Sequence, residues 1–169
     1  YFIPDPWTKT QSDGSYFSRL VNKILKSTVN SNAQNKIGLK NYFYLTLILI
    51  KFLRLRNLGM YLKYFFFSIN QKWYRPLFLD LMLNDIHFNF LNKKKVDFST
   101  IFFNAGAHIQ HHYFFNSLAS QSSFENPEIK VKKSLDPFHE CLNLYEKILG
   151  DYIDNDNYRV ILATGLTQL

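Results

Sequence analysis

Residues 97–112, DFSTIFFNAGAHIQHH, constrain the fold of this chain more than any other stretch. The apolar run 96–103 is typical of a buried strand. The small residues 105–107 predict a tight turn, and three histidines then fall in the first turns of a helix. In α/β proteins, ligands and metal ions gather just beyond the carboxyl ends of strands. We therefore expect any chemistry to lie at this junction.

The order of the other expected elements favours an α/β fold. Helical spacing of apolar residues predicts helices over about 16–27, 39–69 (two helices that break near 57–59), 73–92, 109–119 and 136–149, and strands over 96–103 and 158–163. Strands that alternate with helices indicate a mainly parallel central sheet flanked by helices. We expect one domain, 1–169, with a helical insertion at about 39–92. We also expect it to be incomplete at both ends, because no initiator methionine opens the chain and an apolar strand nearly closes it.

Local signals define several helix ends. Ser15 and Asp136 are typical N-caps, and Pro137 suits the first position of a helix. Cys141 is the only cysteine, which excludes an internal disulfide. It lies among helically spaced apolar residues, so we interpret it as a small buried residue rather than a nucleophile.

The most hydrophobic region is 39–69. Its uncharged run, 41–50, is far shorter than the roughly 20 residues that a bilayer requires, and the rest of the region is interrupted by Lys51, Arg54, Arg56 and Lys63. We expect two mostly buried helices with basic residues on their outer stripe. The alternative is a basic amphipathic surface that makes peripheral contact with a membrane.

The formal charge of +7 leaves two interpretations. One is an anionic partner, and the other is a lysine-rich composition typical of an AT-rich genome. Among anionic partners we expect a phosphorylated or nucleotide small molecule and no nucleic acid. No signal peptide is visible, which favours a cytoplasmic location.

His108, His111 and His112 carry the clearest chemical signal. On a helix, His108 shares a face with His111 or His112, which places two imidazoles within reach of one metal ion. The helix N-terminus attracts anions such as phosphate. The alternative is a polar helix start whose histidines form hydrogen bonds with neighbours.

A second polar pattern runs through the helix 73–92. Asp80, Asn84 and His87 recur at positions i, i+4 and i+7, opposite an apolar face. We interpret this stripe as a solvated face, and the alternative is a supporting role beside the histidine site. Thr164 follows the last expected strand and would open onto the same edge of a parallel sheet.

Three stretches resemble the alkaline phosphatase-like superfamily, in particular type I phosphodiesterase/nucleotide pyrophosphatase-like proteins among bacterial surface-polysaccharide genes. They are FIPDPW at 2–7, DFSTIFFNAGAHIQHHYF at 97–114 and VILATGLTQ at 160–168. The resemblance implies an α/β fold, two metal ions (commonly zinc) and a Ser or Thr nucleophile. The family's middle motif is an Asp followed four residues later by a His. Here Asn104 and His108 hold that spacing, and Thr164-Gly165 stands where the family has an Asp-His pair.

The resemblance implies a metal-dependent phosphoric-ester hydrolase or transferase. It makes His108 the first expected ligand of a divalent ion, zinc, and His111 the second. Asn104, His112 and Thr164 are the expected substrate contacts, and the nucleophile is not assigned. The alternative is a non-catalytic relative that binds a nucleotide-sugar or glycan precursor.

Overall fold

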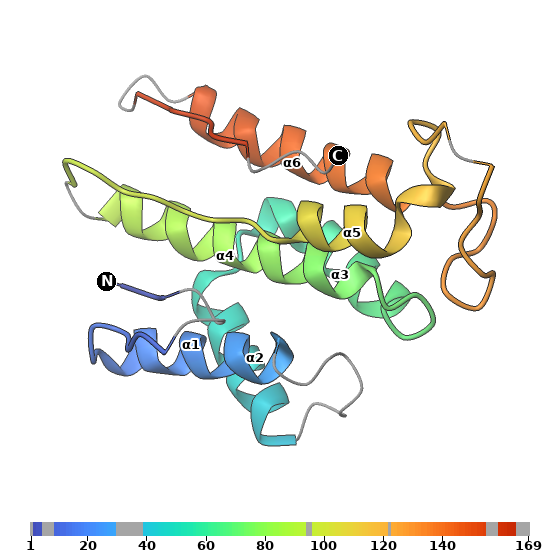
Figure 1. Ribbon diagram of the computed structural model, residues 1–169. Helices are drawn as coiled ribbons and strands as arrows, with labels where there is room; N and C mark the ends of the chain where they lie inside the picture. Colours follow the sequence, from blue (N-terminus) through green and yellow to red (C-terminus); the bar gives the residue numbers. More distant parts are fainter. Residues whose placement is uncertain are drawn as a thin grey trace. The chain divides into compact units, whose positions relative to one another are not determined.

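The computed structural model describes residues 2–4, 9–29, 39–93, 96–121, 123–154 and 159–164. It contains six α-helices and two short 3-10 helices in the described residues (Figure 1). The chain divides into two compact units, Tyr1–Leu53 and Arg54–Leu169. The helical stretch expected over 39–92 is therefore shared between two units, and its role as an insertion stays a prediction.

The first unit pairs α1 (Tyr16–Val29) with α2 (Leu39–Phe52). Ser15 accepts a hydrogen bond from the backbone N–H of Ser18 at 3.2 Å, which confirms the predicted N-cap. The rings of Phe17 and Phe52 lie 4.4 Å apart, between centroids, and join the two helices. The buried side chains of this unit come from one face of each helix: Leu20, Val21, Ile24, Leu25, Ile48 and Phe52.

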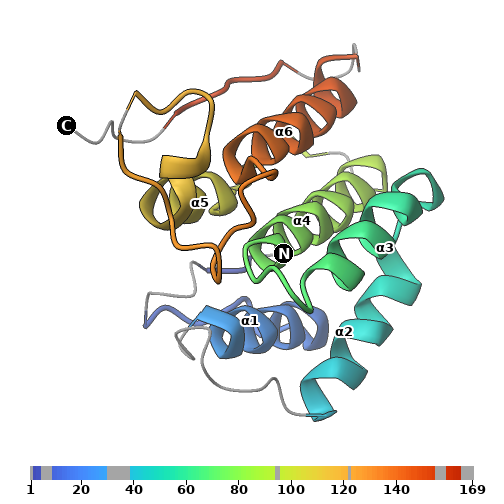
Figure 2. The ribbon, with the colours of Figure 1, turned by 90° about the vertical axis from the view of Figure 1, so that its right-hand side faces the viewer.

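The second unit is built around α4 (Tyr74–Lys93), which contacts α3 (Leu58–Phe67), α5 (Ala105–Tyr113) and α6 (Pro137–Ile153) (Figure 2). Short 3-10 helices, η1 (Leu55–Asn57) and η2 (Phe114–Asn116), precede α3 and follow α5. Its core joins residues from all four helices: Tyr64, Leu77, Leu81, Met82, Ile109, Leu144 and Ile148. Full burial of one such aliphatic side chain contributes about 1.5–3 kcal/mol.

The N-terminal part of α6 confirms three predictions from the sequence. Asp136 accepts from the backbone N–H of His139 at 2.9 Å as the N-cap, and Pro137 occupies the first helical position. Cys141 is 1% exposed, and burial raises the pKa of its thiol to about 12. It is a neutral core residue, as expected.

The predicted α/β fold is wrong. In the described residues there is no strand and no sheet, and the structure is all α-helical. The segment 96–104 runs along α4 as irregular chain, with Phe98 82% and Phe102 71% exposed. A strand forms only when a second segment completes its ladder of hydrogen bonds. Side-chain hydrogen bonds to α4 hold this segment instead, and 159–164 is irregular as well.

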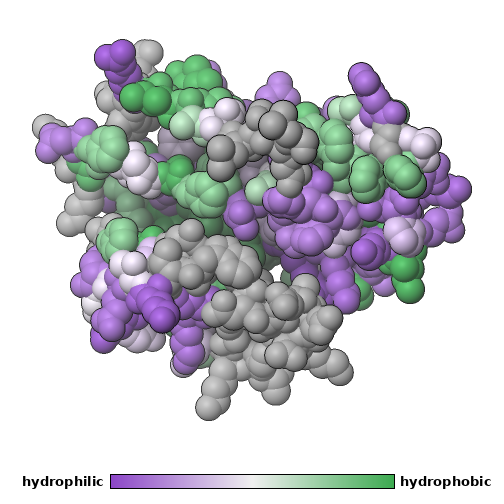
Figure 3. All heavy atoms as spheres, in the orientation of Figure 1, coloured by the Kyte–Doolittle hydropathy of each residue, from purple (hydrophilic) through white to green (hydrophobic). Residues whose placement is uncertain are grey.

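The expectation that the region 39–69 is mostly buried also needs correction. The break between its helices is confirmed, since α2 ends at Phe52 and α3 begins at Leu58. However, many apolar side chains are exposed, and Figure 3 shows hydrophobic residues among hydrophilic ones on the surface. Within the described part of the chain, no helix has both the length and the apolar character to cross a membrane.

Candidate functional site

The three predicted histidines lie on α5, whose first residue is Ala105. The rings of His108 and His112 are 4.8 Å apart between centroids, and those of His111 and His112 are 6.3 Å apart. His108 and His112 are one turn apart, so their side chains share one face. Zinc bonds to imidazole nitrogen at about 2.0–2.1 Å, so rotation of the side chains can bring both rings to one ion.

His108 is in the protonation state that a metal requires. It is half-buried, and burial lowers the pKa of His108 to about 4, with smaller contributions from His112 and His111. The imidazole is therefore neutral at pH 7, with a lone pair available for a ligand bond. His111 and His112 are exposed on the same helix.

The start of α5 is fixed by a carboxylate from another helix. Asp80, on α4, accepts from the backbone N–H of Ala105 at 2.8 Å and of Asn104 at 3.3 Å. Asn104 is the N-cap residue, but its side chain makes no capping hydrogen bond. Asp80 thus satisfies backbone N–H groups at the helix start that have no acceptor within the helix. The side chain of Asn104 is exposed four residues before His108.

Tyr145, on α6, completes this support. Its hydroxyl donates to Asp80 at 2.9 Å and accepts from the backbone N–H of Gly106 at 2.8 Å. Asp80 is 3% exposed, and burial raises its pKa to about 6 against the opposing effect of these hydrogen bonds. Three elements therefore meet at the base of the histidine helix.

The stripe Asp80, Asn84 and His87 is not a solvated face, and that interpretation is wrong. Asp80 and Asn84 are buried, since α5 and α6 cover this side of α4. Buried polar groups need partners, and here Asp80 binds the start of α5 while Asn84 binds α6. The alternative interpretation was that these residues support the histidine site. Asp80 fits it, because its carboxylate binds the start of the histidine helix.

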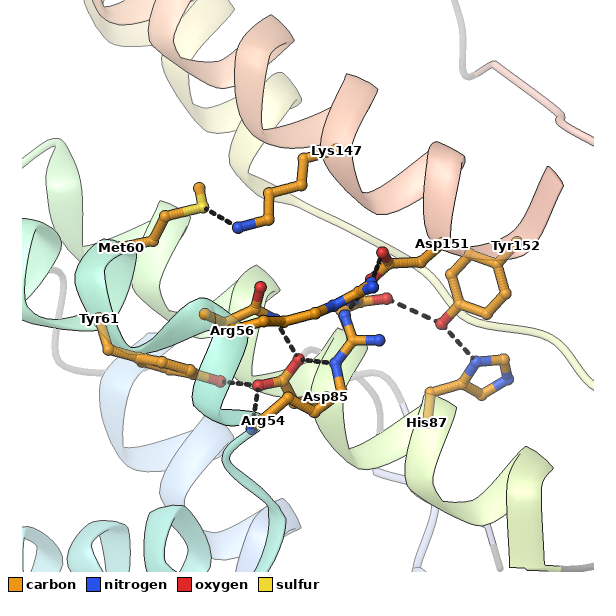
Figure 4. Close-up of polar contacts among 11 residues, drawn as sticks. Arg54, Arg56, Met60, Tyr61, Asp85, His87, Lys147, Asp151 and Tyr152 are labelled. Atoms are coloured by element: carbon orange, nitrogen blue, oxygen red, sulfur yellow. Dashed lines mark hydrogen bonds and ion pairs between the residues drawn. The ribbon is translucent and has the colours of Figure 1, made fainter. Parts of the chain in front are cut away.

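A second polar cluster joins η1, α3, α4 and α6 (Figure 4). Asp85 is fully buried and accepts from Arg54 Nε at 2.8 Å, Asn57 Nδ2 at 2.6 Å and Tyr61 Oη at 3.0 Å. Arg54 also pairs with Asp151. The expectation of outward basic residues thus fails at Arg54, whose side chain is 15% exposed.

The same cluster continues to Arg56 and to the far end of α4. Arg56 forms an ion pair with Asp151 and remains half exposed. His87 lies beside Tyr152, and its ring also reaches Ser99 in the segment 96–104. The two arginines and two carboxylates balance in charge, so this cluster joins helices through paired groups.

The structure brings together some of the predicted site residues. His108, His111, His112 and Asn104 belong to one helix and its cap. Thr164 is exposed in irregular chain, and among the described residues it makes no hydrogen bond to α5. The described part of the chain contains no group of three or more His, Cys, Asp or Glu side chains placed to hold a metal. The ligand and substrate roles of these five residues stay predictions.

Several residues that shape these sites carry little signal in the sequence. Tyr145 looks only like an apolar position of a helix, and nothing near Tyr152, Asp85 or Asp151 marks them as important. One signal is present, because Arg54 closely follows the apolar stretch that ends α2. Arginine is almost never buried unless it is paired, so a charge at the edge of an apolar run indicates a possible buried ion pair.

Comparison with known proteins gives no family for this chain: no protein-family model, no curated protein and no solved structure matches it. The fold and the site define a small helical protein with a histidine-bearing helix. The resemblance seen in three short stretches stays a prediction.

Proposed function

We propose that this protein binds a divalent metal ion, zinc in the first instance, through the histidine face of α5, and holds a phosphorylated small molecule at that ion. The observation that supports the proposal is the 4.8 Å separation of the His108 and His112 rings. Two histidines one turn apart are a common element of zinc sites on helices.

The donor set suits zinc. Imidazole is a borderline ligand that zinc accepts readily, and burial keeps His108 neutral by lowering its pKa. His112 is the second ligand in this proposal, because its ring lies one helical turn from His108 with 4.8 Å between the centroids. His111 is then a contact to the bound ligand.

The neighbouring groups suit a phosphoryl oxygen. The side chain of Asn104 is exposed one turn before His108 and can donate from its amide. When bound, zinc supplies Lewis-acid polarisation of a phosphoryl oxygen. Asp80 and Tyr145 hold the start of the helix, so the imidazoles keep their spacing without a loop to order. The proposed reaction class is phosphoric-ester hydrolysis or transfer, and the alternative is binding without turnover.

Calorimetry with the full chain tests the metal site. Zinc is titrated into the wild type, His108→Ala, His112→Ala and His139→Ala. His139 is an exposed histidine on α6, away from the face, and is the matched control. We expect each of the first two substitutions to weaken binding by at least about tenfold, or about 1.4 kcal/mol, and the control to leave it unchanged. Equal affinity in all four proteins overturns the proposal.

A second measurement separates the two functions. Bis(p-nitrophenyl) phosphate and a nucleoside diphosphate sugar are offered to the zinc-loaded protein. Turnover that His108→Ala abolishes supports the hydrolase, and zinc-dependent binding without turnover supports the non-catalytic alternative. If neither probe binds or reacts, the phosphorylated ligand is excluded.

Peripheral membrane contact is a second candidate, favoured by the exposed apolar side chains of the α3 region. They are Leu55, Leu58, Leu62, Phe65, Phe66, Phe67 and Ile69. Lys63 lies among them, and its ammonium group pairs with Glu140 at 2.6 Å. The exposed apolar side chains themselves suit the interfacial region of a bilayer. Co-sedimentation with vesicles that contain phosphatidylserine tests this contact, and Phe66→Ser should reduce it. Equal sedimentation of the variant and the wild type would exclude it.

A further inference from the structure

A serine, a histidine and a tyrosine form a chain of hydrogen bonds away from α5. Ser99 Oγ lies 2.6 Å from His87 Nε2, and His87 Nδ1 lies 2.9 Å from the hydroxyl of Tyr152. The Tyr152 hydroxyl donates to Asn84 Oδ1 at 2.8 Å. His87 and Asn84 come from α4, Tyr152 from α6 and Ser99 from the segment 96–104.

The direction of these hydrogen bonds follows from the number of protons available. Asn84 Nδ2 faces the carboxylate of Asp151 at 3.5 Å, which orients Asn84 Oδ1 toward Tyr152. Tyr152 has one hydroxyl proton and gives it to Asn84, so its oxygen accepts from Nδ1–H of His87. Nε2 of His87 then carries the lone pair, and it accepts the hydroxyl proton of Ser99.

We propose that Ser99 and His87 are a nucleophile and its general base, with Tyr152 and Asn84 as positioning residues, and that this pair catalyses acyl transfer from carboxylic esters. A nucleophile within about 2.6–3.2 Å of a base that a third group orients is the arrangement that activates a serine. Ser99 is exposed, so an ester can reach it. Tyr152 and Asn84 are buried, so the base is held in place.

The proposed reaction balances in two steps. Ser99 Oγ attacks the ester carbonyl while His87 Nε2 takes its proton, and the resulting imidazolium returns that proton to the departing alcohol. Water then attacks the acyl-serine, His87 takes the water proton, and the proton returns to Ser99 as the carboxylic acid leaves. The oxyanion that forms needs hydrogen-bond donors, and the backbone N–H groups of Ser99 and Thr100 would supply them in this mechanism.

Burial, rather than a neighbouring charge, keeps His87 neutral at pH 7. Burial lowers the pKa of His87. The nearby charged groups on η1, α4 and α6 belong to the paired cluster of Arg54, Asp85 and Asp151. A neutral imidazole is the form that accepts a proton, so the base is ready without a change of ionisation.

Covalent labelling of the full chain tests the nucleophile. A fluorophosphonate probe transfers its phosphonyl group to an activated serine, with loss of fluoride and with the serine proton passing to the base. We expect one label per chain, mapped by mass spectrometry to Ser99 and absent from Ser99→Ala. Ser123→Ala removes another exposed serine and should label as the wild type does. A label on another residue, or none, overturns the proposal.

Esterase kinetics test the base and its positioning. With p-nitrophenyl butyrate, we expect Ser99→Ala and His87→Gln to lower kcat/KM by about 10²–10⁴-fold. Tyr152→Phe keeps the ring contacts with His87 and Phe88 but loses the hydroxyl, so it should lower kcat with KM unchanged. Ser99 is exposed, so its variant should fold normally by circular dichroism.

The proposed zinc site and the proposed serine nucleophile can be tested independently of each other. EDTA should leave the esterase rate unchanged, because the serine pair uses no metal. Wild-type rates in Ser99→Ala, or a rate that EDTA abolishes, contradict the role of Ser99.

Discussion

The carboxylate of Asp80 accepts a hydrogen bond from the backbone N–H of Ala105 at 2.8 Å, so a residue of α4 caps the helix that carries the histidines. The first backbone N–H groups of a helix have no partner within it, and a local N-cap side chain commonly supplies an acceptor. Here a contact between residues 25 positions apart does so, and the position of α5 depends on α4. The geometry of the histidine face therefore reflects packing of the unit Arg54–Leu169 rather than a local turn.

Loss of this cap should destabilise the protein. Asp80→Ala leaves two backbone N–H groups and the Tyr145 hydroxyl without their acceptor in a buried place, at a cost of about 2–4 kcal/mol. Urea unfolding followed by circular dichroism measures the change. Asp97→Ala, at an exposed aspartate in the neighbouring segment, should change the free energy of unfolding by less than about 0.5 kcal/mol. Equal effects would exclude the capping role.

The pKa of Asp80 predicts a pH dependence of stability. Burial raises this pKa from 3.8 to about 6 in the folded protein, so the folded state binds the proton more tightly than the unfolded state between those values. Stability from this group is then fully present below pH 3.8 and is lost as pH rises through 6. The loss is about 3 kcal/mol at most.

Comparison of the wild type with Asp80→Asn isolates this effect, because the amide does not titrate. All other carboxyl groups contribute equally to the pH dependence of both proteins, so their contributions cancel in the difference. The advantage of the wild type in free energy of unfolding should be larger at about pH 4 than at about pH 7. An advantage that grows with pH would mean that the three hydrogen bonds to the carboxylate outweigh its burial.

Two glycines offer a matched test of packing. A Cβ at Gly106 would lie 3.1 Å from Tyr145 Cε2 and 3.3 Å from its hydroxyl, and hydrogen bonds hold that ring in place. Gly106→Ala should destabilise by about 1 kcal/mol despite its better helix propensity. Gly59, in α3, has open space, so Gly59→Ala should stabilise by about 0.5 kcal/mol. The midpoint temperatures of thermal unfolding of the two variants should therefore shift in opposite directions. A shift in the same direction would contradict the close contact between Gly106 and Tyr145.

Removal of Asp85 should be among the most damaging single changes. Asp85→Ala removes the buried acceptor of Arg54 Nε, Asn57 Nδ2 and the Tyr61 hydroxyl and costs about 3–5 kcal/mol. Glu125 pairs with Lys133 at 3.5 Å on the surface, where both side chains are about two-thirds exposed, and Glu125→Ala should cost less than about 1 kcal/mol. Chemical denaturation compares them, and similar losses would contradict the buried role of Asp85.

Local signals in the sequence predicted local structure well. Ser15 and Asp136 cap their helices, and Cys141 is buried, because each depends on neighbours within a few residues. A helix that carries the three histidines is confirmed, but the tight turn expected at 105–107 is wrong, since these small residues form the first turn of α5.

Long-range structure was not predictable in the same way. The run 96–103 is apolar enough for a strand, but pairing depends on a second segment, and the hydrogen bonds of this part of the chain go to Asp80 and His87 of α4 instead. The stripe Asp80, Asn84 and His87 has the same pattern whether water or other helices cover it. Only the packing of α5 and α6 on α4 distinguishes these cases.

The most direct test of the central claim is a zinc titration followed by ¹H–¹⁵N spectra of the histidine side chains. We predict that the imidazole resonances of His108 and His112 shift together and reach their end point at one equivalent of zinc. The resonances of His87 and His139 should stay in place. Zinc shifts that spread equally over all histidines, or none at His108, would contradict a metal site on α5.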